Sequence, residues 1–328
     1  MTQDAREFPA TTPNPVGIEG IEFIEFATRR PQALGQVLET IGFRPIARHR
    51  SREVLLYRQG DMNIIVNAHP EDQPRAAGGA EASLSAPTGA ASNISSPGEV
   101  PTISAFALRV RDAAFAWRHV VEQGAWEVPL RTEVMELHIP AIRCAGGSRV
   151  YFVDRWREFS IYDVDFIPIP TVDARPPAIA GMHWFGIVQY VGPGRSDDWL
   201  AFYRSLFGFE LIPDDVRFGI LHKGLILKSP CDSFYVQLVE ADWDAAETQA
   251  GESLRRIGFG APDVMAAVGA LRELGIGFID TDAVRPTPRG AVTQAQLGGV
   301  MFELVRDAIT EGAGVNEGAG KATRAALP

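Results

Sequence analysis

Cysteine is nearly absent from the sequence. Cys144 and Cys231 are the two cysteines among 328 residues, so a disulfide framework is excluded. Long apolar runs are absent as well, and no stretch approaches the roughly 18 consecutive apolar residues of a membrane helix. Residues 1–15 lack the apolar core of a signal peptide. These absences predict a cytoplasmic protein.

Basic residues are also in short supply. The 31 lysines and arginines are outnumbered by 41 aspartates and glutamates, which gives a net charge of -10. Nucleic acids and anionic membranes both attract basic surfaces, so we expect neither as a partner. What is present is ordinary for a soluble globular protein, with 46% hydrophobic and 22% charged residues. The length predicts about two domains.

Two segments are poor in the residues that build a core. Residues 69–103 are rich in Ala, Gly, Ser and Pro, and we expect an exposed loop between two strands. Residues 308–328 have a similar composition and predict a flexible tail.

The rest of the chain repeats one pattern four times. Each copy has an apolar strand, an amphipathic helix with a glycine at its end, and further strands. The copies start within the segments Ile21–Phe43, Ala105–Ala125, Phe185–Phe209 and Arg256–Phe278. The pattern predicts an α+β fold with antiparallel sheets and outer helices. We expect an N-terminal domain at 14–167 and a C-terminal domain at 178–307, joined by the proline-rich stretch between them. The run FSIYDVDF, residues 159–166, is interpreted as one of the strands.

Several longer motifs resemble bacterial 4-hydroxyphenylpyruvate dioxygenases. They are NPVGIEGIEFIEFA (Asn14–Ala27), HRSREVLLYRQGDMNIIVN (His49–Asn67), MELHIPAIRCAGG (Met135–Gly147) and YFVDRW…SIYDVDF (Tyr151–Phe166). The resemblance is dense over residues 14–69 and 105–170, and thinner over 181–307. It implies a vicinal-oxygen-chelate fold, in which four βαβββ modules form curled sheets that hold a metal in a cupped cavity.

The resemblance also implies a chemistry for the C-terminal domain. In the family, an iron(II) dioxygenase of tyrosine breakdown, two histidines and one glutamate hold the iron and leave positions open for a 2-oxo acid and oxygen. Family members commonly form dimers or tetramers, so a homo-oligomer is a further expectation.

Only one of the three iron ligands is present in this sequence. The resemblance assigns the glutamate to Glu303, the first histidine to Gly186 or Ile187, and the second histidine to Arg256. Glycine and isoleucine have no donor side chain, and the guanidinium of arginine has no lone pair to give. His183 lies three or four residues before the first position, and His222 lies on another predicted strand.

Three functions are left open by these replacements, and the sequence does not decide whether the chain is an enzyme. The first is a metal-free protein, with no cofactor, that binds or acts on a small aromatic or 2-oxo carboxylate. Arg256 and Gln237 would contact this ligand, and we expect Arg256 to form a salt bridge with Glu303, as a ligand grip or as an inert filler. The second is an active iron(II) dioxygenase with displaced ligands, His183 and Glu303 first. The third is a non-enzymatic partner of an active homologue.

Overall fold

The computed structural model describes residues 13–68, 100–129, 137–213, 219, 224–240 and 251–306. Most of the expected loop, at 69–99, and all of the expected tail lie outside these residues. None of the described helices is long and apolar enough to cross a membrane.

The described residues form four modules, each of which begins with a long strand that is followed by a helix. The first module has β1 (Ile18–Ala27), α1 (Pro31–Thr40), β2 (Arg44–His49), β3 (Val54–Gln59) and β4 (Met62–Asn67). The second has β5 (Thr102–Val110), α2 (Ala113–Glu122), β6 (Ala141–Arg143), a 3-10 turn η2 (Ala145–Gly147), β7 (Arg149–Val153), α3 (Ile161–Asp165) and β8 (Phe166–Pro168). The second long strand thus begins at Thr102, two residues inside the segment expected to be a loop.

The C-terminal half repeats this plan. The third module has a 3-10 turn η3 (Ile179–Gly181), β9 (His183–Val191), α4 (Ser196–Phe207), β10 (Glu210–Leu211), β11 (Leu225–Lys228) and β12 (Tyr235–Glu240). The fourth has β13 (Ser253–Ala261), α5 (Val264–Glu273), β14 (Gly290–Val292) and β15 (Met301–Arg306). The α+β class expected from the sequence is confirmed.

Local signals explain where the helices begin and end. The side chain of Asp112 accepts a hydrogen bond from the backbone of Phe115 at the start of α2, and Asp263 caps α5 in the same way. Gly208 ends α4 in the left-handed conformation, φ 76°, that glycine adopts without strain. The helices then bury their apolar faces, as α4 does with Tyr203, Leu206 and Phe207.

One local expectation is wrong. Residues Ile161–Asp165 form helix α3, although the alternating pattern of FSIYDVDF indicated a strand. The physical reason is a capping box: Asp163 accepts hydrogen bonds from the backbone and the hydroxyl of Ser160, which satisfies the helix start. Only Phe166–Pro168 remains extended. This segment forms strand β8, which pairs with β2 at the edge of the sheet.

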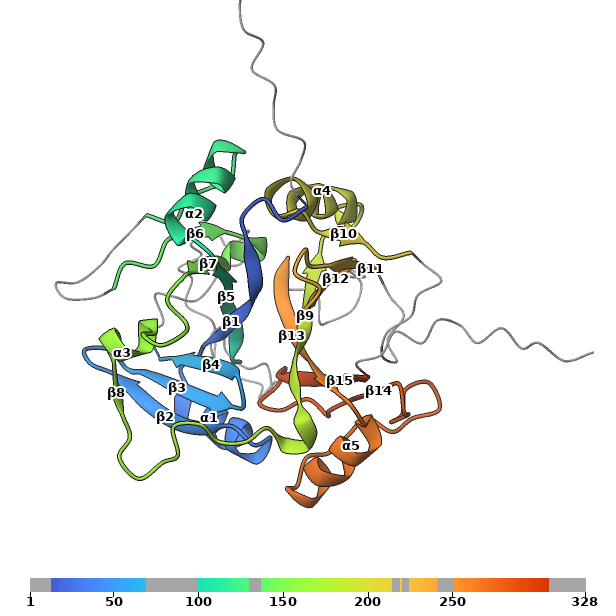
Figure 1. The fold of residues 1–328 in the computed structure, drawn as a ribbon. Coiled ribbons are helices and arrows are strands. Elements are labelled where there is room, and N and C mark those ends of the chain that lie inside the picture. Colours follow the sequence, from blue (N-terminus) through green and yellow to red (C-terminus); the bar gives the residue numbers. More distant parts are fainter. Residues whose placement is uncertain are drawn as a thin grey trace, which may run out of the picture.

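The sheet is mixed rather than wholly antiparallel. The long first strand of each module runs parallel to a later strand of the same module, as in the pairs β1–β4 and β13–β15. The strands of the described residues join into one sheet, because β13 pairs with β5 through Leu254 and Ile103. Figure 1 shows the two halves side by side, with β1, β5, β9 and β13 at the centre.

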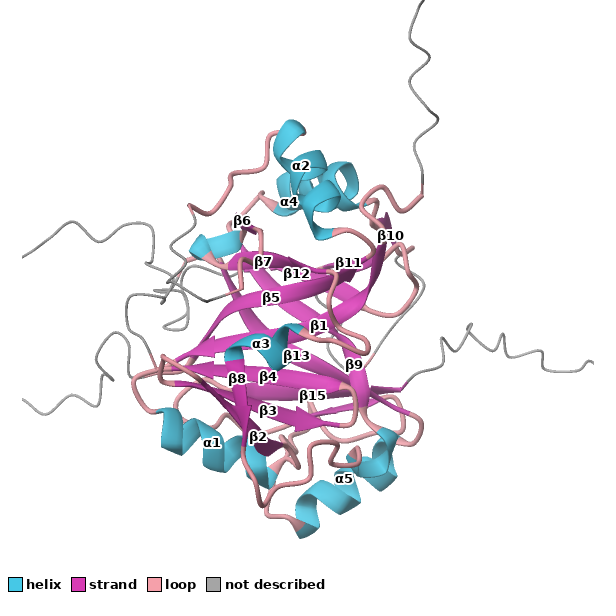
Figure 2. Ribbon diagram, turned by 60° about the vertical axis from the view of Figure 1, so that its left-hand side comes forward, coloured by secondary structure: helices cyan, strands magenta, loops and turns pink. Residues whose placement is uncertain are grey.

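The helices cover the two ends of this sheet. Helices α2 and α4, one from each half, lie together at one end, and α1 and α5 lie at the other (Figures 1 and 2). Most of the apolar core lies between the helices and the sheet and crosses from one half to the other, from Leu34 and Phe152 to Phe207 and Phe259. A second apolar cluster in the N-terminal half contains Phe23, Leu56 and Phe166.

Candidate functional site

One row of residues crosses four neighbouring strands of the C-terminal half. Tyr235 on β12 pairs with Gly186 on β9, which pairs with Gly258 on β13, which pairs with Glu303 on β15. Residues that pair directly in a sheet point to the same face. The two central positions have no side chain, so the row forms a trough between a phenol and a carboxylate.

A second row lies on the same face, one pleat repeat away, which is about 7 Å along the strands. It joins Gln237 on β12, Val188 on β9 and Arg256 on β13. The register between β9 and β13 slips between Leu254 and Arg256, which marks a β-bulge. Bulges of this kind redirect side chains, and they are frequent beside functional sites.

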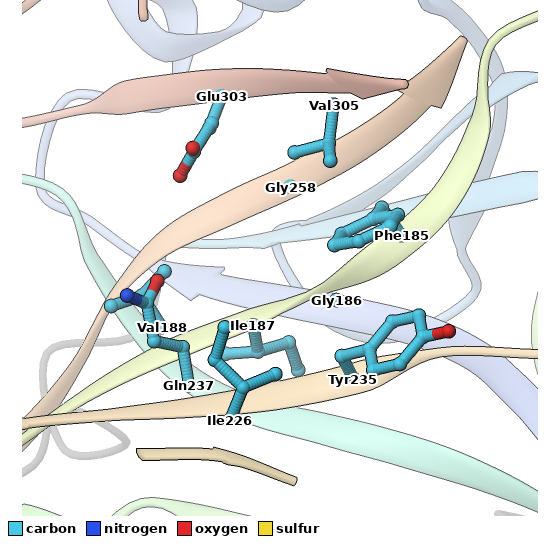
Figure 3. Close-up of a pocket in the computed structure, with 10 residues that line it drawn as sticks. All are labelled: Phe185, Gly186, Ile187, Val188, Ile226, Tyr235, Gln237, Gly258, Glu303 and Val305. Atoms are coloured by element: carbon cyan, nitrogen blue, oxygen red, sulfur yellow. The ribbon is translucent and has the colours of Figure 1, made fainter. Parts of the chain in front are cut away.

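A pocket of about 400 Å³, part of it open to solvent, lies over these rows. Its lining consists of Phe185, Gly186, Ile187, Val188, Ile226, Tyr235, Gln237, Gly258, Glu303 and Val305. In Figure 3 the pocket has two different ends. Phe185 and Tyr235 form the aromatic end, while the side chains of Glu303 and Gln237 point toward one another at the polar end.

The aromatic end is a stacked pair. The ring centroids of Phe185 and Tyr235 are 4.8 Å apart with an angle of 28° between the ring planes. Burial raises the pKa of the Tyr235 phenol above its ordinary value, and nearby Lys228 opposes this shift. The phenol is therefore neutral at physiological pH, and this end of the pocket is uncharged.

Glu303 is a buried carboxylate, with 5% of its surface exposed. It points into the pocket from β15 (Figure 3). Gly219 packs directly against it, and a Cβ atom at position 219 would collide with the Oε1 atom of Glu303. Glycine at position 219, whose φ is 56°, therefore leaves the space that the carboxylate of Glu303 occupies.

Arg256 is also buried, with 7% of its surface exposed, and its Nε atom has no hydrogen-bond partner. None of the ion pairs among the described residues joins it to Glu303, so the expected salt bridge is wrong. The register explains the difference, because the direct neighbour of Glu303 is Gly258, whereas Arg256 pairs with Met301. The pocket face therefore holds a buried cation and a buried anion that are not paired with each other.

The chain has clear relatives. Residues 12–167 match the family described as "Hydroxyphenylpyruvate dioxygenase, HPPD, N-terminal". "Hemolysin VllY" of Vibrio vulnificus is 31% identical over 285 residues, which cover 82% of this chain and 74% of the relative. A 4-hydroxyphenylpyruvate dioxygenase of Pseudomonas aeruginosa is 30% identical over 285 residues, which cover 82% of this chain and 73% of the relative. The chain belongs to the 4-hydroxyphenylpyruvate dioxygenase family.

A solved structure agrees on the fold. A "xylose isomerase-like TIM barrel/4-hydroxyphenylpyruvate dioxygenase fusion protein" superposes with a TM-score of 0.66 at 23% identity, over 92% of this chain and 51% of the fusion protein. The resemblance to the family noted in the sequence is thus confirmed, and the vicinal-oxygen-chelate modules expected from it are those of the structure.

The described residues around Glu303 do not fit the family's iron site. The direct neighbours of this carboxylate in the row are Gly258 and, beyond it, Gly186, and no imidazole lines the pocket in the part of the chain described here. Nor do three His, Cys, Asp or Glu side chains gather anywhere among the described residues. His222 lies outside them. One carboxylate cannot supply the facial set of ligands that iron(II) needs.

A metal-binding side chain at position 186 is excluded for a further reason. A Cβ atom on Gly186 would collide with the backbone carbonyl oxygen of Tyr235 on the neighbouring strand. A side chain there would therefore force the two strands apart rather than reach toward Glu303. At Gly258 the nearest atom to a new Cβ is a ring carbon of Phe185 at 3.5 Å, an ordinary contact.

His183 does not reach the site either. It is exposed at the start of β9 and pairs with Gly260, and its Nδ1 atom lies 3.4 Å from the carbonyl oxygen of Gly181. Three residues of strand separate it from Gly186, which is about 10 Å. His183 is therefore no substitute for the first iron ligand.

Two features of the site were missed from the sequence. One is the aromatic pair of Phe185 and Tyr235, whose members lie 50 residues apart and meet only across β9 and β12. The other is the bulge that precedes Arg256, beside which the guanidinium of Arg255 lies 5.7 Å from the ring centroid of Tyr190. The consecutive arginines were a visible signal, since two cations in a predicted buried strand require partners.

The N-terminal half also contains buried carboxylates. Glu22, with 2% of its surface exposed, forms an ion pair with Arg109 and accepts a hydrogen bond from Asn63 at 3.2 Å. Glu25 forms an ion pair with Arg149 at 3.2 Å. These carboxylates are paired with cations inside the fold.

Proposed function

We propose that this family member has lost the iron site, and that its C-terminal pocket binds a small aromatic or 2-oxo carboxylate without a metal. Arg256 carries the proposal. It is a buried residue with no hydrogen-bond partner for Nε, on the same face of β13 as the lining residue Gly258, at the position that the resemblance assigns to a histidine ligand. A buried charge without a partner costs several kcal/mol, and a bound carboxylate removes that cost.

The lining supports a small planar ligand. Most lining side chains are apolar or aromatic, as in sites that bind small molecules. Gln237 adds an amide at the polar end, where it can donate or accept a hydrogen bond. Because a relative is a 4-hydroxyphenylpyruvate dioxygenase, we propose that this role belongs to aromatic amino acid catabolism in the cytoplasm.

The first test is of the metal. Protein purified without an affinity tag is incubated with iron(II), passed through a desalting column, and measured for iron content and for oxygen consumption with 4-hydroxyphenylpyruvate. The Pseudomonas aeruginosa dioxygenase serves as the positive control. We expect far less than one iron per chain and no oxygen consumption above that of buffer. Stoichiometric iron with oxygen consumption at the rate of the control would overturn the loss of the site.

The second test is of the ligand. Protein treated with EDTA is titrated calorimetrically with aromatic acids, 2-oxo acids and aromatic amino acids. We expect at least one aromatic carboxylate to bind, and Gly258→Leu to abolish its binding, because the added side chain starts in ordinary contact with Phe185 and fills the trough. Binding of none of these carboxylates, or undiminished binding by Gly258→Leu, would overturn the proposed site.

A further inference from the structure

We propose that the aromatic ring of the pocket ligand lies directly over Gly186 and Gly258, in the place that the protein's own Phe23 fills in the N-terminal half. This inference rests on the proposed function and deepens it, because it assigns a position and a size to one part of the ligand. The observation that carries it is the internal repeat of the fold, which provides a filled copy of the same row of residues.

The two halves share one pattern of strand pairing at this place. In the C-terminal half, the row crosses β12, β9, β13 and β15 with Tyr235, Gly186, Gly258 and Glu303. In the N-terminal half, the corresponding row crosses β4, β1, β5 and β7 with Asn63, Phe23, Ala107 and Tyr151. The two central glycines of the pocket therefore correspond to a phenylalanine and an alanine.

A β-bulge at the same place in both halves fixes this correspondence. The register between β9 and β13 shifts after the pair Gly186–Gly258, so Phe185 is the extra residue. The register between β1 and β5 shifts before the pair Phe23–Ala107, so Glu22 is the extra residue. In each half the extra residue comes immediately before the central residue of the row. Position 186 is thus the structural counterpart of position 23.

In the N-terminal half this place is filled by a side chain. Phe23 is buried, with 2% of its surface exposed, and it packs in one apolar cluster with Ala107 and Val153. The centroid of its ring lies 5.8 Å from that of Tyr151. The N-terminal half therefore shows that a row of this geometry accommodates one aromatic ring.

In the C-terminal half neither central position of the row has a side chain. The pocket lies over Gly186 and Gly258, and its lining includes the apolar side chains of Val188, Ile226 and Val305. Removal of a large apolar side chain from a packed place leaves a cavity, and an apolar cavity of that kind binds a ring such as benzene. A ligand ring over the two glycines replaces the side chain that position 186 lacks.

A ring held in this way needs no charged partner. Burial of a phenyl ring contributes about 10- to 100-fold in affinity, because it removes apolar surface from water. We therefore expect the pocket to bind a single neutral aromatic ring, and a carboxylate on the ligand to add to this affinity rather than to create it.

The experiment separates the ring from the carboxylate. Benzyl alcohol carries the ring alone, acetate carries the carboxylate alone, and phenylacetate carries both. Each compound is titrated into EDTA-treated protein by calorimetry. We expect benzyl alcohol to bind at one site per chain, and phenylacetate to bind about 10- to 100-fold more tightly than acetate.

Two glycine substitutions test the position of the ring. Gly258→Leu should abolish the binding of benzyl alcohol and of phenylacetate, because its side chain enters the place of the ring. Gly269→Leu is the matched control, which should bind like the unmodified protein. Gly269 is exposed on α5, and no atom lies within 4 Å of an added Cβ atom there.

The N-terminal half offers the converse test. Phe23→Ala empties the filled copy, so the variant should bind a second benzyl alcohol. Its folding is checked by circular dichroism. The position of the ring is also read in the unmodified protein, from the anomalous signal of iodine in crystals soaked with 4-iodobenzyl alcohol. The test therefore does not depend on the folding of any variant.

The outcomes separate the two proposals. If benzyl alcohol binds over Gly186 and Gly258 and no aromatic carboxylate binds more tightly, the position of the ring is right and the proposed carboxylate site is wrong. If phenylacetate binds no more tightly than acetate, or the iodine lies away from both glycines, the ring inference is wrong and the carboxylate site stands. An iodine signal without binding in solution, which is binding at crystal concentration only, also counts against the ring. If none of the three compounds binds, both proposals are wrong.

Discussion

Replacing Arg256 with methionine should stabilise the ligand-free protein, although it removes a large buried side chain. Arg256 is 7% exposed as a residue and its Nε atom has no partner, so the folded state bears much of the cost of removing a cation from water. Methionine retains an unbranched apolar stem of similar length and fills most of the same space.

The expected size of this stabilisation follows from the replacement of buried charges in other proteins. Exchanging even a buried and paired ionic group for well-packed apolar residues is often neutral or stabilising by about 1–4 kcal/mol. Since Arg256 has no ionic partner among the described residues, we expect Arg256→Met to stabilise by an amount within that range. The free energy of unfolding is measured by urea denaturation of dialysed, EDTA-treated protein, followed by tryptophan fluorescence.

Arg109→Met is the matched control. Arg109 is ion-paired with Glu22, which is 2% exposed, so its removal leaves a buried carboxylate without its cation. Breaking a buried pair in this way typically costs about 3–5 kcal/mol, somewhat less here because Arg109 is 21% exposed. The two substitutions should therefore change stability in opposite directions. If Arg256→Met destabilises the protein as strongly as Arg109→Met, Arg256 has a stabilising partner and the reasoning is refuted.

Two further predictions use pairs of residues as their own controls. Gly186→Ala should destabilise by about 1–3 kcal/mol because its Cβ would collide with the carbonyl oxygen of Tyr235, whereas Gly258→Ala should be neutral or slightly stabilising; equal effects of the two in thermal unfolding would contradict the geometry. Burial raises the pKa of the Cys144 thiol to about 11, so it stays protonated and covered at pH 8, whereas Cys231 is partly exposed. A disulfide reagent should therefore modify one thiol per native chain rapidly, at Cys231 by peptide mapping, and the second only after unfolding; fast modification of both would show that Cys144 is accessible.

The modules could be predicted because their signals are local. The apolar stripe of α4, the glycine that ends it at Gly208 and the cap at Asp263 all act within a few residues of the chain. Such signals repeat with each module, so their number, order and class followed from the sequence. The helix at Ile161–Asp165 had a local signal too, the Ser160–Asp163 capping box, but the alternating apolar residues indicated the opposite structure.

The site could be predicted only in part. Glu303 and Gln237 were identified and both line the pocket, since each is a polar residue within a clearly apolar strand. Arg256 was identified as a replaced ligand, and it lies buried on the same face of the sheet. The roles of these residues in binding remain proposals.

Strand register was decided by the tertiary structure alone. A shift of two residues between β13 and β15 would place Arg256 rather than Gly258 opposite Glu303, with no change in either strand's own pattern of alternation. The bulge before Arg256 and the stacking of Phe185 on Tyr235 likewise depend on pairing between strands distant in the sequence. The sequence therefore determined which residues bear charge in the C-terminal half. Packing between distant strands decided that a buried arginine and a buried glutamate lie on one face of the sheet without forming an ion pair.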